Sequence, residues 1–147
     1  MKNLFKNIIS KNENNLKPTT ENNPELIFID ALKKITEIDT ELGLSHVDDE
    51  ISIYQATVKI FYNNLLKECH NMTELLKNED IAGFATRVHA MKSMLATIGA
   101  TELCETALTL ELAGKKEEAE FCHKNYPLLH EKLLMLNEKL APLFPIQ

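Results

Sequence analysis

The chain has 147 residues, 44% of them hydrophobic, and a formal net charge of −6. This length and composition suit one domain with a hydrophobic core. The acidic balance argues against a duplex nucleic-acid binder, whose contact face is basic. No apolar run approaches the roughly 18 residues that cross a bilayer. The apolar residues near Met1 are interrupted by Lys6 and Asn7, which argues against a signal peptide, so we expect a cytoplasmic protein.

The three cysteines, Cys69, Cys104 and Cys122, are too few and too irregularly spaced for a disulfide framework. All three fall in helical patterns, which favours buried free thiols. A histidine follows directly after Cys69 and after Cys122. Neighbouring helical residues point about 100° apart, so neither pair can chelate from one face, and we expect no metal site.

The N-terminal segment 1–23 carries seven Asn and four Lys and is predicted to be a polar tail or linker, with a short helix possible at 3–10. The domain is predicted to span 24–147. Pro24 suits the first turn of a short helix that ends near Thr36. Residues 37–48 hold a glycine, a serine and several acids and are predicted to form a loop.

Four longer helices follow. The first is expected at about 49–77, capped by Asp48 or Asp49, because apolar residues recur at three-four spacing without Gly or Pro. Asp80 belongs to the Asn-Glu-Asp stretch that breaks this helix and caps the second, which runs to Ile98 and stops at Gly99.

The third helix is expected to be capped by Thr101 and to end at Gly114. The fourth begins near Glu117 and continues to about Leu140, with a kink or a restart at Pro127. No segment alternates with period two. Short connections make sequential helices antiparallel neighbours, so we predict an all-α, up-and-down four-helix bundle with an additional short N-terminal helix.

The second of these helices has one conspicuous polar residue, His89. A buried seam is predicted from residues spaced four, three, four and three apart: Phe84, Val88, Met91, Leu95 and Ile98. His89 lies well off this seam, on the solvent side. Its neighbours there are small, apart from one lysine: Ala82, Ala85, Thr86, Lys92, Ser93 and Ala96. The imidazole therefore stands on an open face with a cation one turn away.

No other constellation indicates catalysis within the chain. His46 is placed in a loop, and His70, His123 and His130 lie on helices without partner ligands, so solvated or packing roles are expected. Neither a nucleophilic triad nor a Gly-rich phosphate loop nor a di-iron motif is present in the sequence. A self-contained catalytic pocket is not expected.

A wider motif surrounds His89 and continues into the third helix. Its parts are His89-Ala-Met-Lys92-Ser93, Ile98-Gly99-Ala100, Leu103, Ala107, Leu110-Glu111 and Ala113-Gly114-Lys115. Over about residues 38–140 the chain resembles the histidine-containing phosphotransfer (HPt) domain of bacterial phosphorelays. The sequence departs from that family at Ser93, where Gly is most frequent, and at Met91, where Leu is usual. The family fold is the four-helix bundle that the periodicity predicts.

The resemblance implies that His89 accepts a phosphoryl group from a receiver-domain aspartate and passes it to another receiver. Lys92 corresponds to the lysine beside the phosphohistidine and would stabilise phosphate charge. The small residues of the open face would form a docking face for the receiver: Ala82, Ala85, Thr86, Ser93 and Ala96. The chain itself would need no cofactor, because the receiver would bring the Mg²⁺, and it would have no kinase activity of its own.

The expected partners are response-regulator receiver domains and a hybrid sensor histidine kinase, with neither nucleic acid nor membrane insertion, and the expected state is a monomer. Two alternatives stay open: a non-phosphorylated adaptor of the same fold that binds a receiver or kinase, and an unrelated structural bundle. The sequence names neither the cognate kinase and receivers nor the direction of phosphate flow. It also leaves open whether the chain is free-standing or part of a larger kinase.

Overall fold

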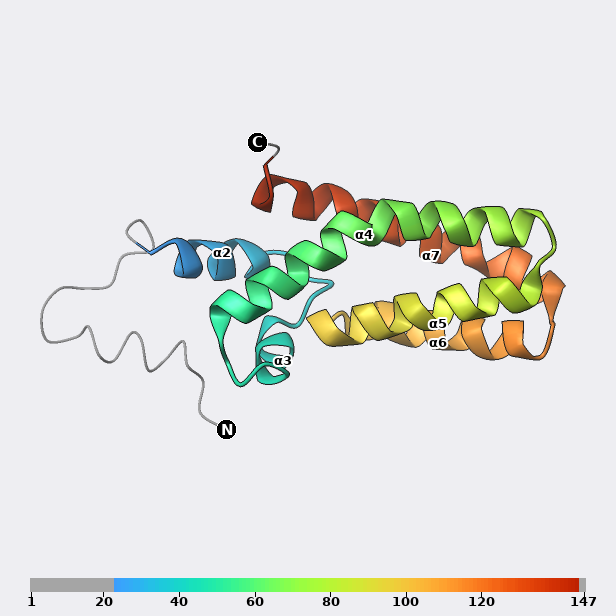
Figure 1. Cartoon of the computed structure of the whole chain (residues 1–147), viewed down its shortest axis with the longest axis horizontal. Helices are drawn as coiled ribbons and strands as arrows, with labels where there is room; N and C mark the ends of the chain where they lie inside the picture. The colour runs from blue at the N-terminus through green and yellow to red at the C-terminus, as the bar shows by residue number, and fades with distance from the viewer. Residues whose placement is uncertain (1–22, 146–147) are drawn as a thin grey trace, which may run out of the picture.

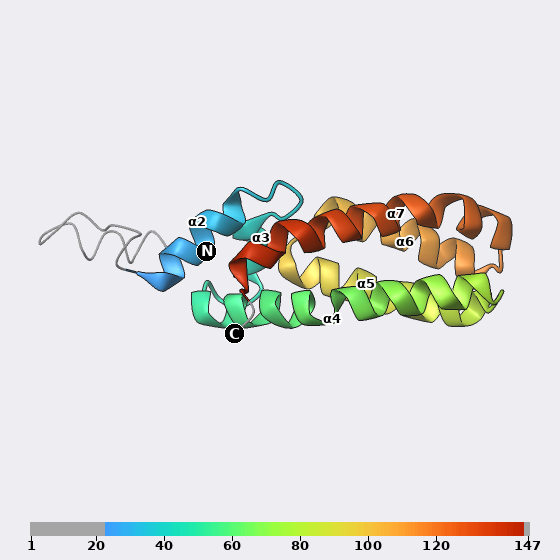
Figure 2. The ribbon, with the colours of Figure 1, turned by 90° about the horizontal axis from the view of Figure 1, so that it is seen from above.

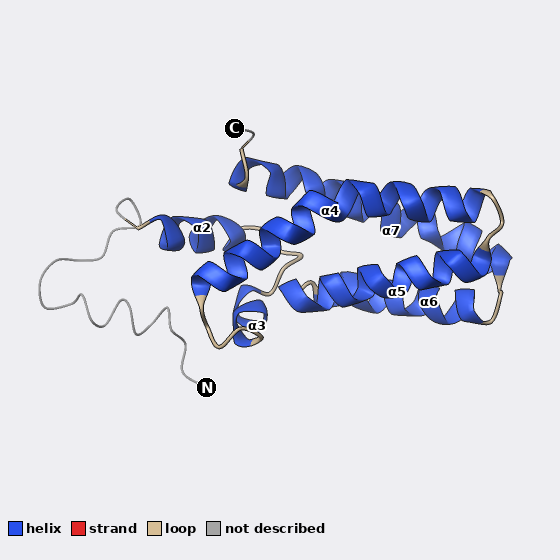
Figure 3. Cartoon of the chain, in the orientation of Figure 1, coloured by secondary structure: helices blue, strands red, loops and turns tan. Residues whose placement is uncertain are grey.

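The computed structural model describes residues 23–145, and all regular structure in that range is helical (Figure 3). The elements in chain order are α2 (Pro24–Lys33), α3 (Thr40–Ser45), α4 (Ile51–Lys77), α5 (Ile81–Ile98), α6 (Thr101–Lys115), α7 (Ala119–Leu140) and the 3-10 turn η2 (Ala141–Leu143). The predicted all-α class is confirmed. The tail and the helix proposed at 3–10 lie outside the described residues, and the division of the chain at 23 stays a prediction.

The long helices α4, α5, α6 and α7 lie side by side along one axis (Figures 1 and 2). Each packs against the next in the chain, and α4 also packs against α7, which closes the bundle. The shorter α2 and α3 gather at the end of the bundle where α5 finishes. The predicted up-and-down topology is confirmed, with one helix more at this end than expected.

The core is built from the apolar stripes that the sequence predicts. On α4 the buried residues follow three-four spacing: Ile51, Tyr54, Val58, Phe61, Leu65, Cys69, Met72 and Leu76. The five predicted seam residues of α5 are all fully buried. Each large apolar side chain so buried contributes roughly 1.5–3 kcal/mol. Because the seam faces the bundle, the opposite side of α5 is left to solvent.

Both ends of α5 are fixed as predicted. Asp80 caps the start, where its carboxylate accepts a hydrogen bond of 2.9 Å from the Gly83 backbone N–H. Gly99 ends the helix at a φ of 91°, a left-handed conformation that favours glycine. A side chain at Gly99 would collide with the carbonyl oxygen of Asp39, whose own N–H donates to the Gly99 carbonyl at 2.8 Å. The bond between Asp39 and Gly99 joins the end of α5 to the start of α3.

The prediction of a loop over 37–48 is wrong, because this segment contains α3. Asp39 caps that helix by accepting a hydrogen bond of 3.0 Å from the Leu42 N–H. Leu44 is buried, and Gly43 lies so close to the Tyr54 ring that any side chain there would clash with it. The glycine that suggested a loop is therefore a packing residue. Upstream, α2 ends at Lys33, before the predicted Thr36.

The predicted caps of two helices are also wrong. Asp48 and Asp49 have positive φ angles of 51° and 61° and form the turn before α4, so Glu50 is its cap residue. Thr101 is the first residue of α6 rather than its cap, which is Ala100. Neither Glu50 nor Ala100 makes a side-chain capping bond, so packing determines these starts.

The C-terminal half of the bundle departs from the prediction at two points. Helix α6 runs through Gly114 to Lys115, and α7 starts at Ala119 rather than near Glu117. Helix α7 continues without a break through Pro127, so the predicted restart is wrong. A proline removes one backbone donor, and the buried stripe on both sides of Pro127 keeps the helix continuous.

Candidate functional site

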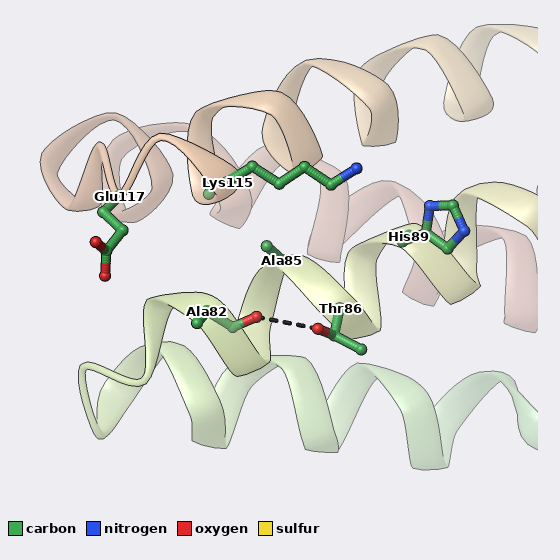
Figure 4. Close-up of a pocket in the computed structure, with 7 residues that line it drawn as sticks. Ala82, Ala85, Thr86, His89, Lys115 and Glu117 are labelled. Carbon is green, nitrogen blue, oxygen red and sulfur yellow. Dashed lines mark hydrogen bonds between the residues drawn. The ribbon is translucent and has the colours of Figure 1, made fainter.

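His89 stands on the outer face of α5, where 55% of its side chain is exposed. Val88, directly before it, and Met91, two residues after it, are fully buried core residues, so the backbone beneath the ring is held in place. Figure 4 shows the imidazole projecting from α5 beside α6. The exposure predicted for His89 is confirmed.

A buried carboxylate on α6, Glu111, meets the histidine from beneath. Its side chain is only 1% exposed. Its Oε2 lies 2.7 Å from His89 Nδ1 and 2.7 Å from Lys115 Nζ, and its Oε1 lies 2.7 Å from Lys92 Nζ. One acid therefore gathers an imidazole and two ammonium groups at the surface of the bundle.

This environment keeps Glu111 ionised. Burial by itself would raise the pKa of the carboxyl group, because a charge is poorly solvated there. Hydrogen bonds from Lys115, Lys92 and His89 outweigh burial and lower the pKa of Glu111 to about 2. At neutral pH the carboxylate is an acceptor only.

The ionised carboxylate fixes the protonation of the ring. Because Glu111 can only accept, the Nδ1 of His89 must carry the proton that forms their 2.7 Å hydrogen bond. In the neutral imidazole, the lone pair then belongs to Nε2. Among residues 23–145 no group hydrogen-bonds Nε2, so this nitrogen keeps its lone pair unpaired on a ring that is half exposed.

A groove extends from His89 along the interface of α5 and α6 to the loop before α7 (Figure 4). Its volume is about 610 Å³, and its lining residues are Ala82, Ala85, Thr86, His89, Gly114, Lys115 and Glu117. The small lining residues keep it open. A methyl group on Gly114 would lie 2.8 Å from the Cβ of Ala85, so glycine at this position lets α5 and α6 approach closely.

The family model of the Hpt domain matches residues 56–139, more than half of the chain. The chain belongs to the Hpt family. The matched range contains all of α5 and α6 and most of α4 and α7, and therefore His89, Lys92, Glu111 and Lys115. Searches of curated proteins and of solved structures found no match.

Membership of the Hpt family implies histidine phosphotransfer in two-component signalling, in which Hpt domains interact with receiver domains and kinases. The matched range excludes α2, α3 and the first turn of α4. The site described above lies wholly within residues 56–139. It is separate from the end of the bundle that α2 and α3 cover.

The structure changes the environment predicted for two site residues. Lys92 is only 23% exposed, because its ammonium group is bound to Glu111 instead of standing free beside the ring. Ala85 was placed on the open face, but it is 3% exposed and packs against Gly114, so this placement is wrong. Ala85 lies four residues before His89, about 40° around the helix on the side of α6, so α6 covers it.

The other predicted docking residues lie on the exposed side of α5. Ala82, Thr86, Ser93 and Ala96 are all exposed. The hydroxyl of Thr86 donates to the Ala82 carbonyl at 3.2 Å, and that of Ser93 donates to the His89 carbonyl at 3.2 Å. Both hydroxyls therefore bond to the backbone of α5, and these short side chains protrude little from the face around the ring.

No role was predicted for Glu111 or Lys115, although both lie in the motif that carries the resemblance to the HPt domain. The sequence did contain a signal. Ala107, Leu110, Glu111 and Gly114 follow the three-four spacing of a buried helical face, and a carboxylate in such a row needs cationic partners. The partners could not be identified, because they depend on how α5 and α6 pack.

The described residues contain no group of three or more His, Cys, Asp or Glu side chains that could hold a metal ion. None of the described helices is long and apolar enough to span a membrane. Cys69 and Cys122 are buried as free thiols, as predicted, whereas Cys104 is only partly buried.

Proposed function

We propose that this Hpt domain relays a phosphoryl group between receiver-domain aspartates, with Nε2 of His89 as the carrier atom. One observation supports this assignment above the others. The ring is exposed at Nε2 and held through Nδ1 by an ionised, buried carboxylate. A neutral imidazole oriented in this way is a nucleophile near neutral pH that needs no further base.

In the proposed step, the lone pair of Nε2 attacks the phosphorus of an aspartyl phosphate. The new N–P bond forms as the P–O bond to the aspartate breaks, and its electron pair leaves with the carboxylate oxygen. The proton on Nδ1 stays in the hydrogen bond with Glu111, which stabilises the positive charge that develops on the ring. The reverse step returns the phosphoryl group to a second receiver.

The two lysines bound to Glu111 would stabilise the phosphoryl group. Together with the single carboxylate, Lys92 and Lys115 give a formal charge of +1 beside the imidazole of His89. A transferring phosphoryl group spreads negative charge over its oxygens, and nearby ammonium groups lower the energy of that charge. This extends the role predicted for Lys92 to Lys115.

The proposed donors and acceptors are response-regulator receivers, with a hybrid sensor kinase as the original source of phosphate. The receiver would supply the Mg²⁺, and the Hpt domain would act in the cytoplasm as a monomer without kinase activity. The exposed residues around His89 would dock the receiver: Ala82, Thr86, Ser93 and Ala96.

Label transfer from purified, phosphorylated receivers of the same organism tests this proposal. The wild-type chain should take up label that is labile in acid and stable in base, as a phosphoramidate is, and His89→Gln should take up none. If the wild-type chain binds a receiver without taking label from any of them, the adaptor alternative replaces the relay. Acid-stable label would instead assign the phosphate to another residue.

A further inference from the structure

The groove beside His89 has an opposite charge at each end. Lys115 lines the His89 end, and its ammonium group is bound to Glu111; Lys92, which does not line the groove, binds the same carboxylate. At the other end lies Glu117, in the loop between α6 and α7. Small, uncharged side chains and one glycine line the stretch between them: Ala82, Ala85, Thr86 and Gly114.

The backbone holds Glu117 in position, while its carboxylate has no partner. Its φ is 55°, in the left-handed region, and its N–H donates to the Gly114 carbonyl at 3.0 Å. No side-chain hydrogen bond or ion pair of Glu117 exists within residues 23–145. Figure 4 shows its carboxylate pointing across the groove toward α5, while the Lys115 side chain extends the other way, toward His89.

A receiver that delivers phosphate to His89 also covers this groove. The groove is continuous with the ring, and its volume of about 610 Å³ can hold several side chains of a docked protein. The phosphorylated aspartate meets the lysines, so negative charge on the partner faces the His89 end. The complementary pattern on the partner then requires a positive charge at the Glu117 end.

We propose that Glu117 selects among receivers by pairing with a Lys or Arg on the receiver segment that enters this groove. The inference rests on the phosphotransfer role proposed above and adds the chemistry of the partner. A receiver with an acidic residue at that point would place two carboxylates together, which disfavours the wrong partner. Charges at two ends of one groove also set the orientation in which the receiver approaches.

The test uses the full chain and a panel of purified receivers of the same organism, each phosphorylated with acetyl phosphate and Mg²⁺. The receiver that labels the wild-type chain fastest is carried forward. We expect Glu117→Gln to lower kcat/KM for transfer about fivefold and Glu117→Lys about tenfold or more, since charges at the rim of an interface act mainly on association. The fivefold difference should shrink as salt is raised.

Glu118→Gln is the matched control. It makes the same change in net charge at the next residue, which is exposed and does not line the groove. We expect its kcat/KM to equal that of the wild type. Circular dichroism melting of all three variants reports whether each is folded.

A charge-reversal rescue experiment distinguishes an ion pair between Glu117 and the receiver from a structural effect of the substitution. Single Lys→Glu and Arg→Glu changes are made around the phosphorylated aspartate of the same receiver. One of them should impair transfer to the wild-type chain and restore it to Glu117→Lys. Equal kcat/KM for Glu117→Gln and the wild type, or no restoring receiver change, overturns the inference and leaves the phosphotransfer role intact. If the wild-type chain takes label from no receiver, the proposed function fails first, and this inference fails with it.

Discussion

Two close histidine–glutamate pairs occur among residues 23–145, and they differ in almost every other respect. His89 and Glu111 meet at 2.7 Å over a carboxylate that is 1% exposed. His123 and Glu79 meet at 2.6 Å, with side chains 41% and 64% exposed. The first carboxylate also binds two lysines, while the second has no further ion pair among the described residues.

The comparison shows that distance alone does not make a site. Water screens the pair of His123 and Glu79, and such exposed pairs contribute roughly 0–1 kcal/mol. Glu111 has lost nearly all contact with water, so its charge depends on the three donors around it, and they in turn are positioned by it. We therefore expect a reactive ring only at His89, where the carboxylate is buried and ionised.

The largest effect is expected when Glu111 is removed. Glu111→Ala leaves two ammonium groups and an imidazole without their common acceptor, and it should lower the free energy of unfolding by about 3 kcal/mol. It should also slow phosphotransfer, because the hydrogen bond from Nδ1 to Glu111 no longer fixes the orientation of the ring. Urea denaturation followed by circular dichroism measures the first effect, and label transfer from a phosphorylated receiver measures the second.

Glu79→Ala is the matched control, since it removes a histidine-bound carboxylate of similar geometry. Its loss should stay within roughly 1 kcal/mol, and its transfer rate should equal that of the wild type. Equal losses in the two variants would show that burial does not distinguish the pairs and would remove the basis for the fixed tautomer.

Lowering the pH should decrease the free energy of unfolding through protonation of Glu111. Its pKa is lowered to about 2 in the folded chain from an ordinary value of 4.5. A depressed pKa contributes stability that is fully present above the unfolded pKa and is lost as pH falls through the folded one. Between pH 5 and pH 2 the wild type should therefore lose about 3 kcal/mol from this group.

Glu111→Gln should lack this pH-dependent contribution to stability. Its free energy of unfolding should lie below that of the wild type at pH 7, and the two curves should converge toward pH 2. Glu79→Gln removes an exposed histidine-bound carboxylate instead and is measured in parallel. Parallel curves for Glu111→Gln and the wild type would contradict the depressed pKa.

The sequence predicted the scaffold of this site better than its chemistry. Periodic apolar residues gave the seam of α5, and Asp80 and Gly99 gave its ends, because these signals are local to one helix. The contact between His89 and Glu111 joins two helices, 22 residues apart in sequence. It depends on the rotation of α6 against α5, which Gly114 and Ala85 set by their close approach. The burial of Ala85 and the pairing of Lys92 were missed for the same reason.

A middle-sized effect is expected at Lys92. Lys92→Ala should slow transfer about tenfold, because one of two cations near the phosphoryl group is lost, while Lys115 remains on Glu111. Its stability should fall by about 1 kcal/mol, less than that of Glu111→Ala. Thermal melting together with transfer kinetics checks this. A loss as large as that of a core substitution would make Lys92 a structural residue and would separate it from the chemistry of His89.

The smallest effect is expected at His123, and it completes the comparison from the histidine side. Its Nε2 joins Glu79, in the loop before α5, to the first turns of α7, but 41% of its side chain is in water. His123→Ala should therefore cost no more than roughly 1 kcal/mol in unfolding free energy and leave label transfer unchanged. His89→Ala, measured in parallel, should abolish transfer while leaving the Glu111 carboxylate with both lysines and the bundle folded. Label appearing on His89→Ala but not on His123→Ala would assign the phosphate to the exposed pair, because a nucleophile would then need only an accessible ring and not the buried acid that holds it.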